Sequence, residues 1–229
     1  MRASWSPCTR TIEPEVEQLI EQSWQRAIAT GIKLFDGAMC RLEAWKATDA
    51  TLQLVLSETT YKTFFGTNLT AAQMADRYGP QVLANPVGVS SALMTSDGFL
   101  ALGRRNAAVA YYPNRIHPFA GALEPKDAGD VFEAVRRELQ EELAIQPREI
   151  VEISCAGIAQ DRSLRQPELI FPTRLKLSGA EVESRLDAEE HRACYMVALN
   201  NAALEKALDD PMLTPIAAAT VMVVHRAGA

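Results

Sequence analysis

The sequence predicts an α/β protein in which a smaller N-terminal α/β region, residues 1–86, precedes a larger domain, residues 87–229. Segments with the two-residue alternation of strands are mixed along the chain with segments of helical period. The dipeptide Asn85-Pro86 marks the boundary between the two parts. A chain of 229 residues, 48% hydrophobic and 23% charged, is also long enough to bury a sizeable core.

The N-terminal region is expected to begin with a helix over residues 15–29. Pro14 and the acidic residues beside it suit a helix start, and Gly31 suits a helix end. The other elements expected in this region are strands at residues 39–47 and 51–57, joined by a turn at Thr48-Asp49-Ala50, and a short helix at residues 70–78.

The larger domain opens with a hairpin signal, because Asp97-Gly98 separates two apolar runs at residues 87–95 and 99–104. Asp130 is a good N-cap for a helix that ends near Leu143. The other expected elements are strands at residues 117–120, 150–160, 168–177 and 193–199, and helices at residues 180–186, 200–208 and 215–225.

Charge and composition exclude several classes of protein. A net charge of −6 argues against binding along a nucleic-acid backbone, which needs a basic surface. No apolar run is long enough to span a membrane, and the N-terminus lacks the apolar stretch of a signal peptide. The four cysteines are scattered, which favours reduced thiols. We therefore expect a cytoplasmic protein, monomer or homodimer, with neither nucleic acid nor membrane as a partner.

Residues 121–145 carry the clearest chemistry. On a helix turning about 100° per residue, Glu138, Glu141 and Glu142 share one face, beside an apolar stripe that would pack on a sheet. Their charges repel one another, and the helix dipole disfavours anions near its C-terminal end. Arg137 can supply one compensating charge, and Mg²⁺ would supply two more. Without a cation, a solvated acidic face is the ordinary interpretation of such a helix.

This segment resembles the Nudix box, a motif written G-x5-E-x7-R-E-U-x-E-E-x-G-U in which U is a bulky aliphatic residue. Its second half matches from Arg137 to Ile145, except that Ala144 takes the place of the glycine. Its first half opens at Gly121, and Asp127 takes the acidic position. Nine residues rather than seven separate Asp127 from Arg137, and the insertion falls in a loop, where length costs little.

The resemblance implies the Nudix fold, an α/β/α sandwich with a mixed sheet, and hydrolysis of a diphosphate with Mg²⁺, or Mn²⁺ as the alternative cation. By position, Glu138, Glu141 and Glu142 would be the metal ligands, and Arg137 would orient them through a salt bridge. Mg²⁺ suits this reaction because it neutralises phosphate charge and activates water. A further carboxylate often serves as the base, and a plain surface role is the alternative for each candidate. These candidates are Glu168, Glu189 and Glu190.

Two other stretches, residues 61–69 and 87–105, are similar to the branch of Nudix enzymes that includes the animal UDP-glucose diphosphatase. In that branch an N-terminal α/β region precedes the catalytic domain, and a glutamate stands where this chain has Glu168. The resemblance implies a UDP-sugar substrate such as UDP-glucose, cleaved to UMP and a sugar 1-phosphate. The animal enzyme has a degraded box whereas this chain keeps the core of the motif, so substrate specificity need not transfer.

Substrate-binding candidates come from the ends of predicted elements. Arg104 and Arg105 follow a strand and could contact phosphates through their forked donors, although arginines at strand ends are as often solvated. Gly121 opens the loop of the box. Tyr111 and Tyr112 could stack on a base, with core packing as the alternative.

Other functions stay open beside hydrolysis of a UDP-sugar. ADP-ribose or a dinucleotide could be the substrate of the same carboxylates. A Nudix-like module that only binds a nucleotide has no need of three crowded carboxylates, and an isomerase acting on isopentenyl diphosphate would need a catalytic cysteine, for which Cys155 is not at an identifiable site. We therefore expect a magnesium-dependent hydrolase that acts on a small-molecule nucleotide.

Overall fold

The computed structural model describes residues 1–11, 13–31, 34–48 and 51–228. Asp49 and Ala50 of the predicted turn lie outside the described residues. The chain forms two compact units. Unit 1 comprises Met1–Val87, Ala122–Val131 and Gln160–Pro167, and unit 2 comprises Gly88–Gly121, Phe132–Ala159 and Glu168–Ala229.

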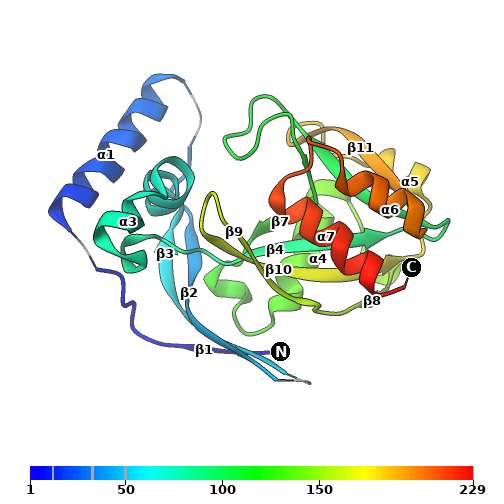
Figure 1. Ribbon diagram of the computed structural model, residues 1–229, viewed down its shortest axis with the longest axis horizontal. Coiled ribbons are helices and arrows are strands. Elements are labelled where there is room, and N and C mark those ends of the chain that lie inside the picture. The colour runs from blue at the N-terminus through cyan, green and yellow to red at the C-terminus, as the bar shows by residue number, and fades with distance from the viewer. Residues whose placement is uncertain (12, 32–33, 49–50, 229) are drawn as a thin grey trace. The chain divides into compact units, whose positions relative to one another are not determined.

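Unit 1 contains a three-stranded sheet in the order β1-β3-β2, as far as the chain is described (Figure 1). Strand β3 (Leu52–Thr60) pairs antiparallel with β2 (Ala38–Ala47) and parallel with β1 (Arg2–Trp5). The sequence predicts β2 and β3. It does not predict β1, because these four residues are mostly exposed and show no apolar alternation.

The first helix, α1 (Pro14–Ala29), has proline in its first turn and buries Val16, Ile20, Trp24 and Ala27. This spacing places the four side chains on one face of the helix. The remaining helical segments of unit 1 are α2 (Tyr61–Phe64), a π-helical turn (Phe65–Leu69), α3 (Met74–Tyr78) and single 3-10 turns at Pro80–Val82 and Pro125–Asp127.

Gly66 allows the π-helical turn to approach α1 closely. A Cβ atom at this position would lie 2.6 Å from the backbone Cα of Ile20. Because the clash is with backbone, a larger residue would force the helix and the turn apart. The glycine therefore determines how closely these two segments of unit 1 pack.

Unit 2 is organised around a mixed sheet in which the described strands run in the order β11-β5-β4-β10-β8. Strand β10 pairs parallel with β4, and the pairs β4–β5, β5–β11 and β10–β8 are antiparallel. Shorter strands extend the sheet, β6 beside β5, β7 beside β4 and β9 beside β10. The strands are β4 (Gly88–Met94), β5 (Phe99–Arg105), β6 (Ile116–His117), β7 (Phe119–Ala122), β8 (Ile150–Ile153), β9 (Gly157–Asp161), β10 (Gln166–Leu175) and β11 (His191–Ala198).

The single strand predicted over residues 150–160 is wrong, because the structure divides it into β8 and β9. Gly157, at the start of β9, has a positive φ of 141°, a conformation that only glycine adopts readily. The break between β8 and β9 therefore lies next to a residue whose backbone conformation is not that of a regular strand.

Helices cover both faces of the sheet in unit 2, which gives an α/β/α arrangement. On one face, α6 (Asn201–Leu208) and α7 (Pro215–Arg226) form a core with Ala92, Leu102 and Ile170, and Figure 1 shows these two helices in front of the strands. On the other face lies α4 (Val131–Leu143), where Phe132 contacts Phe171 with ring centroids 5.4 Å apart. The remaining helical segments are α5 (Gly179–Glu183) and a 3-10 turn at Pro147–Glu149.

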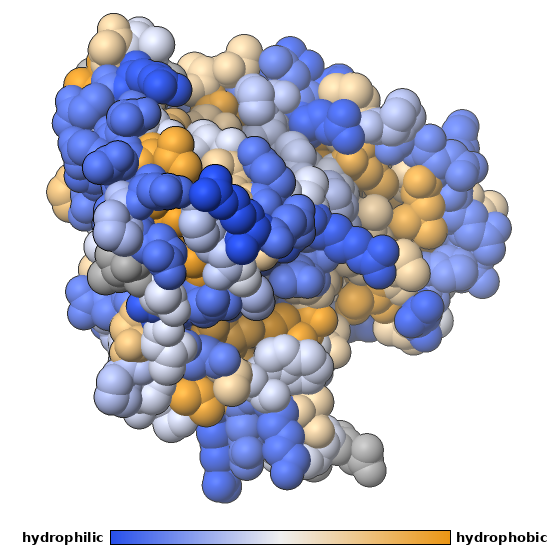
Figure 2. Space-filling view, turned by 60° about the vertical axis from the view of Figure 1, so that its left-hand side comes forward, coloured by the Kyte–Doolittle hydropathy of each residue, from blue (hydrophilic) through white to orange (hydrophobic). Residues whose placement is uncertain are grey.

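Apolar residues on the surface are scattered over both units. Exposed large hydrophobic side chains include Trp5, Phe35, Trp45 and Val151. On the face of the molecule drawn in Figure 2, hydrophilic residues predominate and apolar residues form separate patches. Single exposed apolar residues are normal on soluble folds and need no special role.

Helix α4 ends in a left-handed residue. Ala144 has a φ of +50°, its N–H donates to the carbonyl of Gln140 at 3.0 Å, and the following Ile145 is buried. This is a common way for a helix to terminate, and glycine is the residue that adopts it without strain. Ala144 therefore occupies the position where the Nudix box has glycine, but it carries a Cβ that this conformation disfavours.

We expect Ala144→Gly to stabilise the protein by about 1 kcal/mol, because it removes the strain of the left-handed alanine. The melting temperature should rise by roughly 2–4 °C in thermal unfolding followed by circular dichroism. Ala202→Gly, at an exposed position of α6, is the control and should lower stability by about 0.5–1 kcal/mol. Equal destabilisation by both substitutions would contradict the strain at position 144.

Candidate active site

The apolar face of α4 fixes its orientation on the sheet. Val131, Val135, Leu139 and Leu143 are each at most 4% exposed, and they recur every fourth residue. The carboxylates of α4 lie at the edge of this apolar stripe. Exposure therefore changes sharply from one carboxylate to the next.

The three predicted metal ligands on α4 differ in exposure. The side chain of Glu141 is 59% exposed, that of Glu138 is 13% exposed and that of Glu142 is 3% exposed. Arg137 connects two of them, because its Nη1 lies 2.6 Å from Oε1 of Glu138 and 3.3 Å from Oε2 of Glu141. The guanidinium group of Arg137 thus bonds both a partly buried and an exposed carboxylate.

Gly121 makes room for Glu138. A Cβ atom at position 121 would overlap the carboxylate of Glu138. The first glycine of the box therefore lets the backbone of β7 pass directly beside a partly buried carboxylate.

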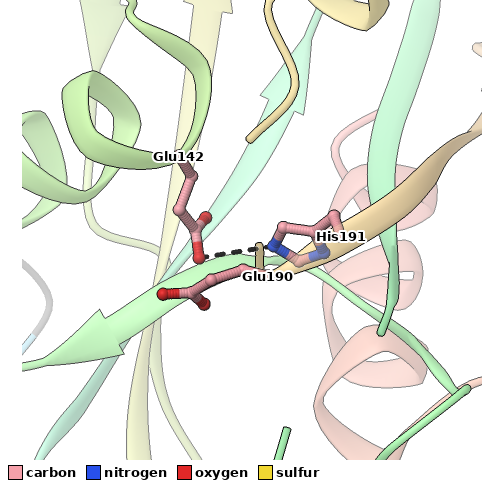
Figure 3. A group of neighbouring side chains, drawn as sticks. All are labelled: Glu142, Glu190 and His191. Carbon is pink, nitrogen blue, oxygen red and sulfur yellow. Dashed lines mark hydrogen bonds and ion pairs between the residues drawn. The ribbon is translucent and has the colours of Figure 1, made fainter. Parts of the chain in front are cut away.

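A second group of polar residues surrounds Glu142. Among the described residues, Glu142, Glu190 and His191 bring metal-binding atoms within 4.8 Å of one another (Figure 3). Figure 3 shows the Glu142 side chain pointing from α4 toward the start of β11, where Nε2 of His191 lies 3.4 Å from its Oε1. Arg105 provides a nearby positive charge, with Nη1 3.9 Å from Oε2 of Glu190.

Burial shifts the titration of these groups. Loss of solvent raises the pKa of Glu138 to about 7, against the opposing charge of Arg137. Burial, together with the negative charge of Glu190, raises the pKa of Glu142 well above its usual value. Burial and the charge of Arg105 lower the pKa of His191 to about 4. His191 is therefore neutral at pH 7, the form in which imidazole binds metals.

The donor set around Glu142 suits a divalent cation. Oε2 of Glu142 is buried and has no hydrogen-bond partner among the residues that the structure describes. A buried carboxylate oxygen without a partner is costly, and coordination to a cation would remove that cost. Carboxylate oxygens suit Mg²⁺, and the imidazole nitrogen of His191 adds a ligand that transition metals such as Mn²⁺ accept.

Strand alternation places Glu168 on the other face of the sheet from α4. Glu168 is two residues from Ile170, which packs with α7, whereas the intervening Leu169 and the following Phe171 face α4. The buried Glu168 carboxylate accepts a hydrogen bond from Ser90. Glu168 and the cluster at Glu142 therefore lie on different faces.

Arg104 and Arg105 are separated by the same alternation. Arg104 follows Leu102 on the face that packs with α6 and α7, and its Nε has no hydrogen-bond partner within the described chain. Arg105 points to the face of α4, is 8% exposed, and donates from Nε to the carbonyl of Tyr111 at 2.8 Å. The structure thus does not bring the two predicted phosphate-binding arginines together.

Asp127 lies in unit 1, in the 3-10 turn before α4. It is 7% exposed, and its charge contributes to raising the pKa of the buried Cys40, although burial is the larger cause. Its carboxylate is therefore in the interior of unit 1.

The sequence analysis missed His191. The ring of His191 packs against Phe119 with centroids 5.1 Å apart, and a Cβ at Gly103 would overlap it. A signal was present in the run Glu189-Glu190-His191 directly before a predicted strand, but the pairing of β11 with β5 is what brings this histidine to Glu142.

These features form a partly buried group of acidic residues on and beside a helix of an α/β/α fold. The NUDIX domain model matches residues 84–217 of the chain. Because this match covers more than half of the sequence, the chain belongs to the NUDIX family.

The relatives indicate a particular branch of the family. The chain is 25% identical to the uridine diphosphate glucose pyrophosphatase NUDT22 of Bos taurus, over 99% of this chain and 91% of that protein. It is 24% identical to the NUDT22 of Mus musculus, over 93% of this chain and 81% of that protein. It is 33% identical to the human protein over 49% of this chain and 42% of that protein.

Solved structures also resemble this chain. DR0079 from Deinococcus radiodurans aligns over 62% of this chain and 83% of its own, with a TM-score of 0.48 and 17% identity. A MutT protein from Methanosarcina mazei aligns over 62% of this chain and 94% of its own, with a TM-score of 0.48 and 19% identity.

The chain is therefore a Nudix diphosphatase, a hydrolase with an α/β fold. The predicted family and class of enzyme are confirmed. None of the helices in the described part of the chain has the length and apolar character needed to cross a membrane.

We expect Gly121→Ala to lower hydrolysis about 100-fold, because the added methyl group forces the Glu138 carboxylate to move by about 1 Å or more. The clash is with the end of a flexible side chain, so the melting temperature should change little. Gly129→Ala is the matched control, since a Cβ there meets no atom within 4 Å. Steady-state rates of both variants test this, and a fully active Gly121→Ala would show that the position of Glu138 is unimportant.

The stability of the metal-free protein should fall as pH rises from about 5 to about 7. The pKa of Glu138 is raised from 4.5 to about 7, so in this interval the folded protein holds a proton that the unfolded chain has released. Each such proton lowers the free energy of unfolding by roughly 1 kcal/mol per pH unit. Glu142 acts in the same direction.

Urea unfolding in EDTA at several pH values measures this slope. Glu138→Gln should reduce it, because the amide does not titrate. An identical slope in the wild type and in Glu138→Gln would mean that burial of this carboxylate does not control the pH dependence.

Proposed function

We propose that this enzyme hydrolyses a nucleoside diphosphate linked to another group, with a UDP-sugar such as UDP-glucose as the first candidate and a divalent cation as cofactor. The observation that carries the proposal is the burial of Glu138 and Glu142 on one helix, with Oε2 of Glu142 lacking a hydrogen-bond partner among the described residues. Burying carboxylates without a partner destabilises the fold, whereas a bound cation would compensate their charge.

The proposed metal ligands are Glu138, Glu141 and Glu142, with Glu190 and His191 as additional donors beside Glu142. Bound Mg²⁺, or Mn²⁺, would neutralise phosphate charge and lower the pKa of a coordinated water. Arg137 would orient Glu138 and Glu141 through its two salt bridges.

Glu190 is the stronger candidate for the base. Its side chain is 47% exposed, so its carboxylate is open to solvent, and it lies beside Glu142. Glu168 is buried, bonded to Ser90 and on the other face of the sheet. Glu190 can therefore accept a proton from a water next to the acidic cluster, whereas Glu168 supports the strand on which it lies.

The three predicted substrate-binding residues take different roles in this proposal. Gly121 leaves the space that the Glu138 carboxylate occupies, because it has no side chain. Arg105 is a positioning residue, because it is buried and its charge faces Glu142 and Glu190. Arg104, on the other face, is left without a role in phosphate binding.

The choice of substrate is supported by the relatives named as uridine diphosphate glucose pyrophosphatases, at 24% and 25% identity over most of the chain. We take residues 87–229 as the proposed catalytic domain and residues 1–86 as the proposed N-terminal region. ADP-ribose and dinucleotides remain alternative substrates, since the carboxylates act on the diphosphate and not on the base. A module that only binds nucleotides is the alternative to an active enzyme.

A substrate panel with Mg²⁺ tests the proposal directly. UDP-glucose, ADP-ribose, NADH and a diadenosine polyphosphate are compared at equal concentration, and we expect UDP-glucose to be cleaved fastest, to UMP and glucose 1-phosphate. Glu142→Gln should lower the rate about 100-fold or more. Glu133→Gln, at an exposed position of the same helix, is the control and should keep full activity.

Two outcomes would reject parts of the proposal. If the wild-type protein cleaves none of the four substrates with Mg²⁺ or Mn²⁺, these substrate classes are wrong. If Glu142→Gln is fully active, the metal ligands are wrong even though hydrolysis is real. Glu190→Gln should lower kcat about 100-fold or more, whereas Glu168→Gln should leave kcat within a few-fold of the wild type.

A further inference from the structure

We propose that unit 1 contains a second binding site, a cationic cavity that takes a small molecule carrying a phosphate group. The cavity has a volume of about 620 Å³ and is lined by residues of unit 1 alone, among them Arg41, Glu43, Arg162 and Arg165. A volume of this size is typical of sites for small molecules. None of the proposed metal ligands contributes to its lining.

The innermost charges of the cavity form a compensated pair. Nε of Arg41 lies 3.1 Å from Oε1 of Glu43, and both side chains are less than 10% exposed. Although burial alone raises the pKa of Glu43, hydrogen bonds from Ser57 and Thr9 and the charge of Arg41 hold it below its usual value. Glu43 is thus a satisfied anion, and the Arg41–Glu43 pair as a whole carries no net charge.

Of the two further arginines in the lining, Arg162 gives the cavity its uncompensated positive charge. Arg162 is exposed and forms no salt bridge or hydrogen bond with any described residue. Arg165 lies 2.5 Å from the exposed carboxylate of Asp76. Since Arg41 and Arg165 are each paired with a carboxylate, the charge of Arg162 leaves the cavity locally positive in a chain with a net charge of −6, and a local positive potential attracts anions.

The loop that carries Arg162 is held in place. The buried carboxylate of Asp161 accepts hydrogen bonds from N of Ser163 at 2.9 Å and from Oγ of Ser163 at 2.6 Å. The amide of the buried Asn68 donates to the carbonyl of Leu164 at 2.9 Å. A preorganised loop loses little entropy when it binds a ligand, so its free arginine is suited to recognition.

The chemistry of the cavity favours phosphate. An unbonded guanidinium such as that of Arg162 can pair with phosphate through two parallel hydrogen bonds. Nη2 of Arg41 can add one more donor, because Nε and Nη1 of Arg41 are already bonded to Glu43 and Leu83. The size of the cavity leaves room for the sugar or nucleoside attached to the phosphate. The products of the proposed reaction, UMP and a sugar 1-phosphate, are therefore suitable probes, and this choice of probes is the one part that rests on the proposed function.

Isothermal titration calorimetry in EDTA tests the site without divalent cations. The full-length protein is titrated with UMP, glucose 1-phosphate, inorganic phosphate and citrate. We expect UMP or glucose 1-phosphate to bind with a Kd of roughly 1 mM or below and inorganic phosphate to compete with it. Arg162→Glu should weaken binding about tenfold or more, and Arg226→Glu, the same charge change at an exposed position of α7, should not.

The binding data separate this site from the catalytic one. Glu142→Gln should bind UMP as the wild type does, even if it is inactive or if the wild-type enzyme cleaves no tested substrate. Absence of saturable binding by the wild type would overturn the proposal, as would equal binding by Arg162→Glu. Binding of citrate as tightly as UMP would overturn the preference for phosphate.

Discussion

Burial of carboxylates between α4 and the sheet is the constraint on which the site in unit 2 depends. An apolar stripe draws α4 onto the sheet, and the same rotation of the helix carries Glu138 and Glu142 away from solvent. Desolvation opposes their ionisation, which is why the pKa values of both rise. Arg137 offsets part of this cost for Glu138. Oε1 of Glu142 lies beside the neutral His191, whereas Oε2 of Glu142 has no hydrogen-bond partner among the described residues. Packing of α4 thus buries carboxylates whose negative charge a divalent cation can compensate.

The two-residue period of the strands distributes the polar side chains of unit 2 between the two faces of its sheet. Residues next to one another in the sequence, such as Arg104 and Arg105, belong to opposite faces. On the face of α4, Arg105, His191 and Glu142 form a group of interacting charges and dipoles. On the face of α6 and α7, Glu168 accepts a hydrogen bond from Ser90. Both faces of the sheet in unit 2 therefore carry buried polar residues, but only those on the face of α4 interact with the carboxylates of that helix.

The elements determined by local sequence were predictable. Helix α4 follows from its apolar spacing and the hairpin of β4 and β5 from Asp97-Gly98, and the motif from Arg137 to Ile145 indicated the family. Long-range pairing was not predictable. β1 exists because it pairs with β3 some fifty residues later, and His191 meets Glu142 because β11 pairs with β5. The period of a strand shows that Arg104 and Arg105 diverge, but only the packed helices show which face each of them joins.

Three glycines in the strands of unit 2 limit how this enzyme could be redesigned. Gly88, Gly103 and Gly121 lie directly against the side chains of Glu168, His191 and Glu138, so the volume that each lacks is already filled. A mutant library that varied these positions would consist largely of variants with a displaced carboxylate or imidazole. The segment from Asn106 to Arg115, which connects β5 to β6, contains no regular element, but its ends are also held, because Asn106 donates to the carbonyls of Ala188 and Glu189 and Arg115 to that of Leu213. At these three positions the absence of a side chain on the strand is therefore what allows a polar side chain from elsewhere in unit 2 to keep its place.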